Sequence, residues 1–271
     1  MSKKEITYGG ENYPSPFDVP IVTRFEDTGR ALYRKNASSK DMPPVIGREF
    51  KDGKVFLSYR GVNLVPGADS RFLAKHVAEI ASALGREGHF TAVDVGTGTG
   101  IFATYLAEAL SSNPYSQVIA TDISGKALEV AGINFALNGI SKPPSLRNRD
   151  LLTDIALEFG KVDLVVSNPP YTPSDRLRNN GFEPALANDG GADGMDLCRK
   201  LFKQSRETLR ADGTIVIQIV SINAARVIKC AQDILPSASI GYVNNPATNR
   251  SCGLIIGRGD LIRRFSTGMI S

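Results

Sequence analysis

The stretch TAVDVGTGTG, residues 91–100, decides the fold of this chain. Its first half is an apolar run typical of a buried strand, and a helical pattern follows at 99–110. Between them, Gly96, Gly98 and Gly100 allow a tight backbone turn and let a ligand approach the main chain closely. Amides at the N-terminus of the following helix can face an anionic or polar group. The stretch therefore predicts a ligand crevice of the kind found in doubly wound α/β sheets.

Apolar strands alternate with helical patterns from this stretch onward. Such alternation predicts an α/β fold with a mostly parallel sheet that helices cover on both faces. Only the loop Asn244–Arg250 separates the last two strands, which indicates an antiparallel hairpin at the sheet's edge. The predicted strands span 91–95, 116–121, 162–166, 213–219, 238–243 and 253–257, and the predicted helices span 99–110, 124–138, 193–209 and 222–234.

The chain divides into three regions by composition. Residues 1–42 are polar and rich in Gly, Pro and Ser, so we expect an N-terminal arm or a small cap. Residues 43–66 contain two apolar runs around Asp52-Gly53, a strong turn signal that predicts a β-hairpin. The remaining region, 67–271, carries the alternating pattern, and Asp69-Ser70 is expected to cap its first helix.

The composition excludes several classes of protein. With 271 residues, 42% hydrophobic and 22% charged, the chain is neither wholly disordered, collagen-like nor a disulfide scaffold. Its two histidines, His76 and His89, and three scattered cysteines predict no metal site. The N-terminus has no apolar run and no stretch approaches the ~18 apolar residues of a membrane span, so we expect a cytoplasmic protein without a membrane partner. The net charge of +4 neither requires nor forbids nucleic acid.

Three kinds of nucleotide site compete for the glycine loop. A P-loop requires Gly-Lys-Ser/Thr, but Ile101 follows Gly100, and a dinucleotide site prefers GxGxxG over the GxGxG found here. The third, an S-adenosylmethionine (SAM) site, is suggested because the loop resembles the first motif of Rossmann-like methyltransferases, in which an acid such as Asp94 precedes the glycines. A purely structural glycine turn also stays open.

Two later acidic residues are candidates for the same ligand: Asp122 follows the next predicted strand, and Asp150 follows a short apolar stretch. Asp122, 22 residues after Gly100, stands at a strand tip, where a carboxylate can accept both ribose hydroxyls of a nucleoside or cap the following helix. Ile123 is assigned to the same site. In the methyltransferase resemblance, Asp150 accepts a hydrogen bond from the adenine amino group and Leu151 offers its backbone amide. A solvated loop aspartate is the alternative for Asp150.

The strand at 162–166 leads into Asn168-Pro169-Pro170-Tyr171, the motif that narrows the chemistry. The prolines exclude helix and ladder pairing, so the side-chain carbonyl of Asn168 and the backbone carbonyl of Pro169 can form a pair of acceptors. Two acceptors that hold the N–H groups of a planar amide or amine align its nitrogen with a methyl sulfonium and favour the positive charge that develops there. Tyr171 offers a flat face for stacking. These four residues are the predicted catalytic residues, with Asn168 also contacting the cofactor; a rigid turn is the alternative.

A closer resemblance comes from FEPALANDGGADGMD, residues 182–196, which looks like the segment after NPPY in the HemK/PrmC family of protein-(glutamine-N5) methyltransferases. Residues 43–50 and 62–66 are similar to that family's hairpin entry and to the strand before its catalytic domain, so the resemblance covers residues 43 to about 258. It implies a Rossmann-like class I methyltransferase fold, with a seven-stranded, mostly parallel sheet whose last strand is antiparallel. It also implies SAM as methyl donor and a protein glutamine as acceptor, in a peptide release factor or ribosomal protein.

Residue roles follow from the same resemblance. The methionine end of SAM is assigned to the glycine loop with Thr97, the ribose to Asp122, the adenine to Asp150 and Leu151, and the acceptor amide to the NPPY motif. Glu183 lies in the loop expected to close over the pocket, in a structural or substrate-positioning role. The loop residues assigned to SAM are Asp94, Gly96, Thr97, Gly98 and Gly100.

The chain departs from the family in two places. Only 42 weakly patterned residues stand where the family has a helical docking domain. The family's Arg-Pro-x-Thr-Glu run is replaced by Gly67-Ala68-Asp69-Ser70-Arg71, which inverts the charge at Arg71 in a segment expected to border the active site. The acceptor therefore stays open between a protein glutamine, a nucleobase amino group and a small molecule, and a SAM-binding protein without activity is a fourth hypothesis. A nucleic-acid enzyme needs a basic track; the candidates are Arg176, Arg178, Arg258, Arg263 and Arg264. The sequence does not indicate an oligomeric state.

Overall fold

A computed structural model describes most of the chain after the N-terminal arm. The described residues are 6–8, 11–13, 23–24, 45–59, 62–179, 187–220 and 223–270. Most of the predicted arm and Glu183 lie outside these ranges, so the structure does not place them.

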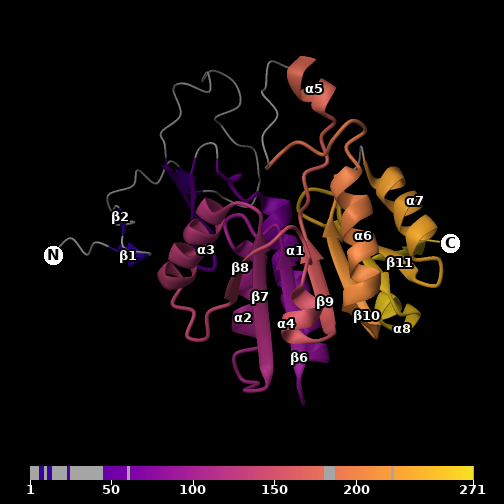
Figure 1. The fold of residues 1–271 in the computed structure, drawn as a ribbon, viewed down its shortest axis with the longest axis horizontal. Helices are drawn as coiled ribbons and strands as arrows, with labels where there is room; N and C mark the ends of the chain where they lie inside the picture. The colour runs from indigo at the N-terminus through magenta and orange to yellow at the C-terminus, as the bar shows by residue number, and fades with distance from the viewer. Residues whose placement is uncertain are drawn as a thin grey trace.

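The centre of the molecule is one eight-stranded sheet (Figure 1). Its strands are β6 (Phe90–Val95), β7 (Ser116–Asp122), β8 (Ser145–Asn148), β9 (Val162–Ser167), β10 (Leu209–Gln218), β11 (Ser239–Asn245), β12 (Arg250–Gly257) and β13 (Gly268–Ile270). They lie in the order β13-β11-β12-β10-β9-β6-β7-β8. The five from β8 to β10 are parallel, whereas β12 is antiparallel to both β10 and β11. The predicted mostly parallel sheet is confirmed.

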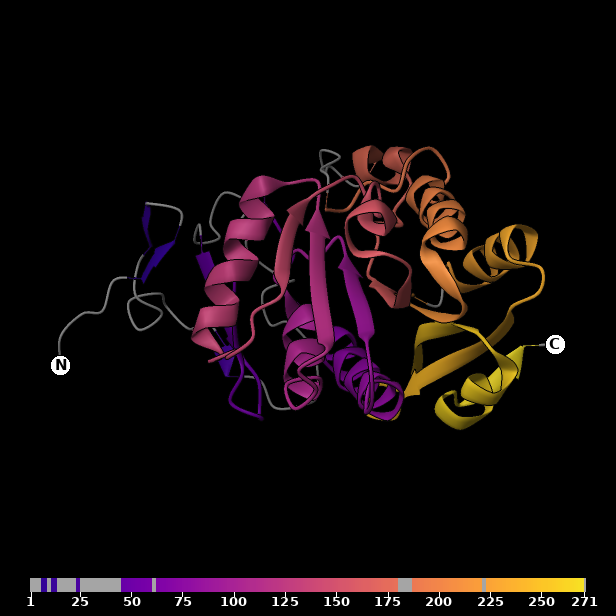
Figure 2. The same cartoon turned by 60° about the horizontal axis from the view of Figure 1, so that its bottom comes forward.

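Helices cover both faces of the sheet, as Figure 2 shows. The helices are α1 (Ala68–Leu84), α2 (Ile101–Ala109), α3 (Gly125–Leu137), α4 (Ile155–Phe159), α5 (Ser174–Asn179), α6 (Asp196–Thr208), α7 (Ala224–Ile234) and α8 (Gly259–Phe265). Two apolar clusters fill the space between sheet and helices. One holds buried residues of α1, α2 and α3, and the other holds those of α4, α6 and α7. Alternate residues of β9 enter the two clusters, with Val166 in the first and Val165 in the second, which explains the unbroken apolar runs in the sequence.

The order of the strands brings two loops together at one edge of the sheet. The chain runs from β6 outward to β7 and β8 and then returns to place β9 on the other side of β6. At such a switch point, the loops after the two central strands diverge and leave room at the carboxyl edge of the sheet. The loops after β6 and β9 are the glycine loop and the NPPY motif, so topology alone brings the two motifs together.

Several details differ from the sequence prediction. The sheet has eight strands instead of seven, because β13 pairs with β11 and takes the edge position expected for the last hairpin. The strands β8 and β13 escaped prediction because they are short, and β8 reads Ser-Leu-Arg-Asn without an apolar run. Asp69-Ser70 does not cap α1: the N-cap is Gly67, without a side-chain hydrogen bond, and Asp69 lies in the first helical turn.

The predicted hairpin is present and is held to the main sheet by α3. Its strands β4 (Val45–Glu49) and β5 (Val55–Tyr59) are antiparallel, and Gly53 adopts φ +77° in the turn. Asn138 Oδ1 and Nδ2 bond to the backbone N and O of Val55 at 2.9 and 2.8 Å, and Asn134 does the same with Leu57 at 2.8 and 3.0 Å. Two carboxamides one helical turn apart thus replace a neighbouring strand for β5.

Within the described ranges, none of the helices combines the length and the apolar character that crossing a membrane requires.

Candidate active site

The glycine loop after β6 has the open conformation that a ligand needs. Gly96, Gly98 and Gly100 have φ of +68°, +54° and +79°, a region that other residues rarely adopt. A Cβ on Gly100 would lie 2.7 Å from the Phe135 ring, so packing also requires glycine there. A Cβ on Gly96 would meet nothing within 4 Å. The loop is therefore packed on its helix side and open at Gly96.

Asp94, near the end of β6, supports this loop through hydrogen bonds. Its side chain is fully buried, and Oδ2 accepts hydrogen bonds from Thr97 Oγ1 at 2.7 Å and from the amide of Ala103 at 3.0 Å. Its other oxygen, Oδ1, accepts none from any residue that the structure describes. Burial, with a smaller contribution from the negative charge of Asp122, raises the pKa of Asp94 to about 7 although its two hydrogen bonds oppose the shift. Asp94 is thus both a support for the loop and a half-satisfied polar group next to it.

Asp122 at the tip of β7 contacts the same loop. Its Oδ2 accepts the amide of Gly98 at 3.0 Å, and its Oδ1 accepts the amide of Ser124 at 2.9 Å. Ser124, not Asp122, is the N-cap of α3, since its hydroxyl accepts the amide of Ala127. Burial raises the pKa of Asp122, opposed by these amide bonds. The neighbouring Ile123 leaves 57% of its surface exposed, an apolar face beside the predicted nucleoside position.

The segment after β8 reaches the same edge. The amide of Arg149 bonds to the carbonyl of Asp122 at 3.1 Å, which brings Asp150 and Leu151 next to the tip of β7. Leu151 has φ +56°, a strained conformation for a residue with a branched side chain and one that often marks a ligand contact. Asp150 forms an ion pair with Lys200 of α6, so any adenine contact would share this carboxylate with a lysine.

The NPPY motif begins directly beside the glycine loop. Val95 and Ser167 are register partners in β6 and β9, and Ser167 Oγ bonds to the carbonyl of Val95 at 2.8 Å. Gly96 and Asn168 are the next residues on the two strands. Oδ1 of Asn168 is buried and accepts no hydrogen bond from the described residues. The site therefore contains an unpaired amide oxygen next to the open glycine loop.

A second glycine-rich loop, residues 188–194, packs against the end of the NPPY motif. The amide of Gly190 bonds to the carbonyl of Thr172 at 2.8 Å, and the amide of Ser174 bonds to the carbonyl of Gly191 at 3.0 Å. A Cβ on Gly190 would lie 2.9 Å from the Cα of Tyr171, and a Cβ on Gly194 would collide with the carbonyl of Tyr171. These glycines of the NDGGADG sequence therefore allow the loop to pack directly on the backbone of Tyr171.

The altered segment after Pro66 carries two side chains of opposite charge, Arg71 and Asp69, and each has partners within the fold. Arg71 lies over the Phe50 ring at 5.4 Å and 3.4 Å from Asp52 in the hairpin turn, so its inverted charge is matched within the fold. Asp69 instead lies toward the strand ends, where Oδ1 accepts Asn245 Nδ2 at 2.8 Å and Thr248 Oγ1 at 3.0 Å. Burial, and then the charge of Asp69, raise the pKa of Tyr171. Asp69 thus lies near Tyr171, in the segment that the sequence predicts to border the active site, although the residue itself was expected to cap α1.

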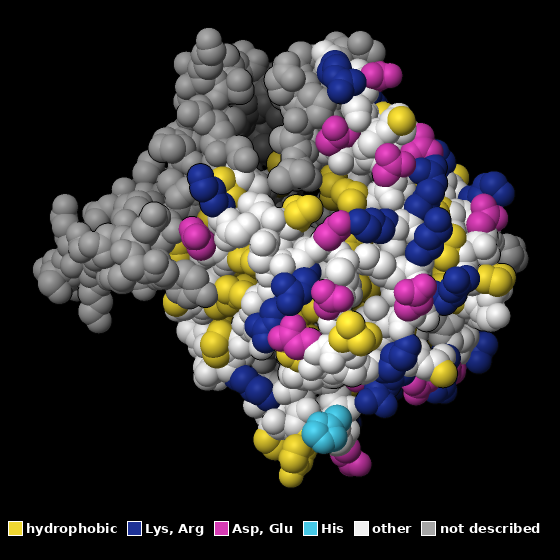
Figure 3. All heavy atoms as spheres, in the orientation of Figure 1, with side chains coloured by type: hydrophobic (Ala, Val, Ile, Leu, Met, Phe, Trp, Pro, Cys, Tyr) yellow, Lys and Arg dark blue, Asp and Glu magenta, His cyan; other side chains and the backbone are white. Residues whose placement is uncertain are grey.

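The arginines considered for a nucleic-acid track do not form one surface. Arg176 and Arg178 lie on α5, whereas Arg263 and Arg264 lie on α8, at a different end of the molecule in both ribbon views (Figures 1 and 2). Arg178 pairs with Asp175 at 3.0 Å. On the face drawn in Figure 3, lysine and arginine side chains are interspersed with aspartate and glutamate.

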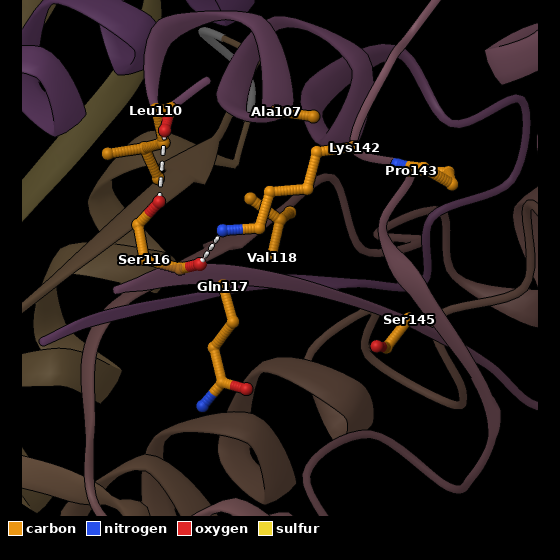
Figure 4. Close-up of a pocket in the computed structure, with 8 residues that line it drawn as sticks. All are labelled: Ala107, Leu110, Ser116, Gln117, Val118, Lys142, Pro143 and Ser145. Carbon is orange, nitrogen blue, oxygen red and sulfur yellow. Dashed lines mark hydrogen bonds between the residues drawn. The ribbon is translucent and has the colours of Figure 1, made fainter. Parts of the chain in front are cut away.

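A small cavity at the opposite end of β7 is not part of this site (Figure 4). Its volume is about 70 Å³, far below the roughly 300 Å³ at which ligand pockets begin. The ammonium of Lys142 bonds there to the carbonyl of Ser116 and to those of Asn113 and Pro114 at 3.4 and 3.3 Å. Lys142 therefore donates hydrogen bonds to backbone carbonyls at the amino end of β7.

Comparisons with known proteins agree with this geometry. Residues 67–229 match the family model of the methyltransferase small domain. The chain is 40% identical over 132 residues to the ribosomal protein uL3 glutamine methyltransferase of Bordetella pertussis, covering 47% of this chain and 43% of that protein. It is 31% identical over 211 residues to the release factor glutamine methyltransferase of Cereibacter sphaeroides, covering 76% of this chain and 69% of that protein.

A solved structure supports the fold alone. The SAM-dependent methyltransferase from Agrobacterium tumefaciens overlays with a TM-score of 0.53 at 16% identity, covering 82% of this chain and 71% of that one. The match to the uL3 enzyme spans less than half of that relative's length. On the family match and the relative from Cereibacter sphaeroides, the chain belongs to the methyltransferase small-domain family and, within it, to the HemK/PrmC group.

Proposed function

We propose that this protein is a SAM-dependent N-methyltransferase whose acceptor is the side-chain carboxamide of a glutamine in a protein. One observation carries the proposal: the buried, unpaired Oδ1 of Asn168 stands beside the open glycine loop at the topological switch point. Leaving a buried acceptor unpaired costs about 1–3 kcal/mol, so a ligand N–H is its expected partner.

The residues at the glycine loop fit SAM. Gly96 leaves the main chain accessible, and Asp94 keeps one oxygen free next to the loop. The position of Asp122 next to Gly98 supports its assignment to the ribose hydroxyls, and the exposed side chain of Ile123 supports an apolar contact with a ring face. Ile101 stands where a phosphate-binding loop has its lysine, which disfavours a triphosphate. When bound, SAM supplies a methyl group on a positively charged sulfur.

The protein's part in the reaction is to hold the acceptor nitrogen. An amide nitrogen is a weak nucleophile because its lone pair is delocalised into the carbonyl. Asn168 Oδ1 and the Pro169 carbonyl accept its two N–H groups, which fixes its direction and favours the positive charge that develops on it. The ring of Tyr171 flanks the planar group, and the negative charge of Asp69 nearby favours the same charge. The proton leaves the nitrogen after the methyl group has arrived.

A protein acceptor is favoured over a nucleobase by two features. The relatives named above act, by their names, on a release factor and on ribosomal protein uL3. The basic side chains that a nucleic-acid substrate would need are distributed over α5 and α8, and several are paired with acids. Since SAM and these substrates are found in the cytoplasm, we propose that the protein acts there.

The test offers methyl-labelled SAM separately with a release factor, ribosomal protein uL3, tRNA, DNA and a small-metabolite extract. We expect label on one of the two proteins, located at a glutamine by mass spectrometry of its peptides. Label on nucleic acid or on a metabolite, with both proteins unlabelled, contradicts the proposed acceptor.

A further inference from the structure

A second carboxamide lies at the end of the strand beside Asn168. Ile217 of β10 and Ser167 of β9 are register partners in parallel strands. The next residues on the two strands, Gln218 and Asn168, are therefore neighbours at the carboxyl edge of the sheet.

The two side chains also share a face. Side chains two residues apart on a strand point to the same face of a sheet. Val216 and Val166, two residues before Gln218 and Asn168, both belong to the apolar cluster under α1 and α2. Gln218 and Asn168 thus extend on that side of the sheet, where α1 also presents Asp69.

Gln218 is buried, and its side-chain oxygen has no hydrogen-bond partner among the described residues. Only 7% of its surface is exposed, and Oε1 accepts no hydrogen bond from any described residue. On its other side the register partner is Gly253 of β12, which offers no side chain. Buried carboxamides are normally satisfied, because each unpaired atom costs free energy. Hydrogen bonds to the described residues therefore do not account for the side-chain oxygen of a glutamine at this position.

We propose that Gln218 is a specificity-determining residue of the acceptor pocket, where its carboxamide pairs with that of the acceptor beside Asn168. A primary amide presents two N–H groups and one carbonyl oxygen. Asn168 Oδ1 and the Pro169 carbonyl are placed for the N–H groups, and Gln218 adds a neighbouring donor and acceptor for the carbonyl and an N–H of the acceptor chain. A carboxylate has no N–H groups for Asn168 Oδ1 and the Pro169 carbonyl, so an acceptor held by these groups together with Gln218 is an amide rather than a carboxylate.

This inference rests on the proposed function, and a near-isosteric variant tests it. Gln218→Met keeps the volume and removes both hydrogen-bonding atoms. We expect KM for the acceptor protein to rise roughly tenfold or more, with the SAM dissociation constant unchanged. The midpoint of thermal unfolding should stay equal or rise by about a few degrees, because an unpaired buried amide is removed. A purely structural glutamine predicts the reverse, a lower midpoint with an unchanged KM.

A pH profile separates recognition from packing. Gln218→Glu reproduces the shape and the donor only while its carboxyl is protonated, and burial raises the pKa of a carboxyl. Methyl transfer by this variant should therefore recover as the pH falls, relative to wild type. Gln117→Met is the matched control, since Gln117 lies near the amino end of β7 and bonds to Thr91 Oγ1 at 2.9 Å. Its acceptor KM should equal that of wild type.

The outcomes are distinguishable. If the wild type labels a protein glutamine and Gln218→Met has an unchanged acceptor KM, the role of Gln218 is refuted and the proposed function stands. If the wild type binds SAM but labels no protein, the proposed function fails and this inference fails with it.

Discussion

Three of the buried side-chain oxygens that accept no hydrogen bond from the described residues lie near the carboxyl ends of neighbouring strands. They belong to Asp94 near the end of β6, Asn168 after β9 and Gln218 at the end of β10. Each costs about 1–3 kcal/mol while unpaired, so three at one edge indicate a surface prepared for a ligand with N–H or O–H groups. This grouping follows from strand order, since the three residues are separated by 74 and 50 positions in the chain.

Asp94 predicts a pH dependence of stability. Its pKa of about 7 in the folded protein lies above 3.8, the ordinary pKa of an aspartate in an unfolded chain. The folded state therefore binds the extra proton, and this contribution to the free energy of unfolding is full below about pH 4 and is lost as the pH rises through about 7. Asp94→Asn removes this dependence, whose ceiling is about 1.4 kcal/mol per pH unit for one proton. Urea unfolding of both proteins between about pH 5 and 8 measures it.

The variant should gain stability relative to wild type as the pH rises. A difference in unfolding free energy that stays constant over this range would show that Asp94 is ionised throughout.

Asp122 is predicted to hold the ribose of SAM. Asp122→Asn keeps an oxygen for only one of the two amides, Gly98 or Ser124, and loses the charge, so we expect SAM affinity to fall about tenfold while the fold persists. Isothermal titration calorimetry measures it. Asp163→Asn is the control, because Asp163 accepts the amide of Thr91 at the far end of the sheet. An unaltered dissociation constant for Asp122→Asn would remove it from the ribose role.

At the scale of elements, α3 links the hairpin to the glycine loop. Asn134 is fully buried and bonds to the N and O of Leu57, and its Nδ2 also donates to the carbonyl of Thr99 at 2.8 Å. One side chain thus fixes β5 and the loop before α2 in relation to each other. A shift of the hairpin would therefore be transmitted to the predicted SAM position.

Asn134→Ala should consequently affect both elements. Loss of three hydrogen bonds leaves buried backbone groups unpaired, so the free energy of unfolding should fall by about 2–4 kcal/mol and SAM binding should weaken. Asn138→Ala, which removes only the bonds to Val55 and α3, should destabilise without changing SAM affinity. Equal SAM affinity in both variants would disprove the link between hairpin and loop.

Elements with a strong apolar period were predictable, and edge elements were not. The strands from β6 to β12, except β8, and the helices α2, α3, α6 and α7 lie within a few residues of their predicted positions. β8 and β13 are short edge strands whose pairing partners, not their own composition, define them.

The candidate site was predictable where a motif lies on one loop. Asp122 and Asn168 lie beside the glycine loop because parallel strands end at one edge, and their roles toward SAM and the acceptor stay predictions. Asp69, Asn134 and Gln218 were missed because their meaning depends on contacts across the chain. A single sequence does not reveal which distant residues a polar side chain in a helix or at a strand end will contact. For Arg71, the sequence showed the inverted charge but not its partner, Asp52.

At the scale of the whole molecule, the predicted site residues lie at the carboxyl edge of the sheet, and the other elements hold that edge in place. The returning chain places β9 beside β6, so the glycine loop and the NPPY motif, more than 60 residues apart in the chain, follow neighbouring strands at the same edge of the sheet. The chain belongs to the HemK/PrmC group, and in its altered segment Arg71 pairs with Asp52 while Asp69 bonds to Asn245 at the carboxyl end of β11.

Two measurements on Asn168→Ala test directly whether Asn168 holds the acceptor nitrogen. Methyl transfer to the acceptor protein should fall at least about a hundredfold, because one of the two groups that hold the nitrogen is gone. The SAM dissociation constant should stay within about twofold of wild type, since Asp94, Asp122 and the glycine loop remain. Undiminished transfer by this variant would contradict the central claim that Asn168 holds the acceptor nitrogen beside the glycine loop.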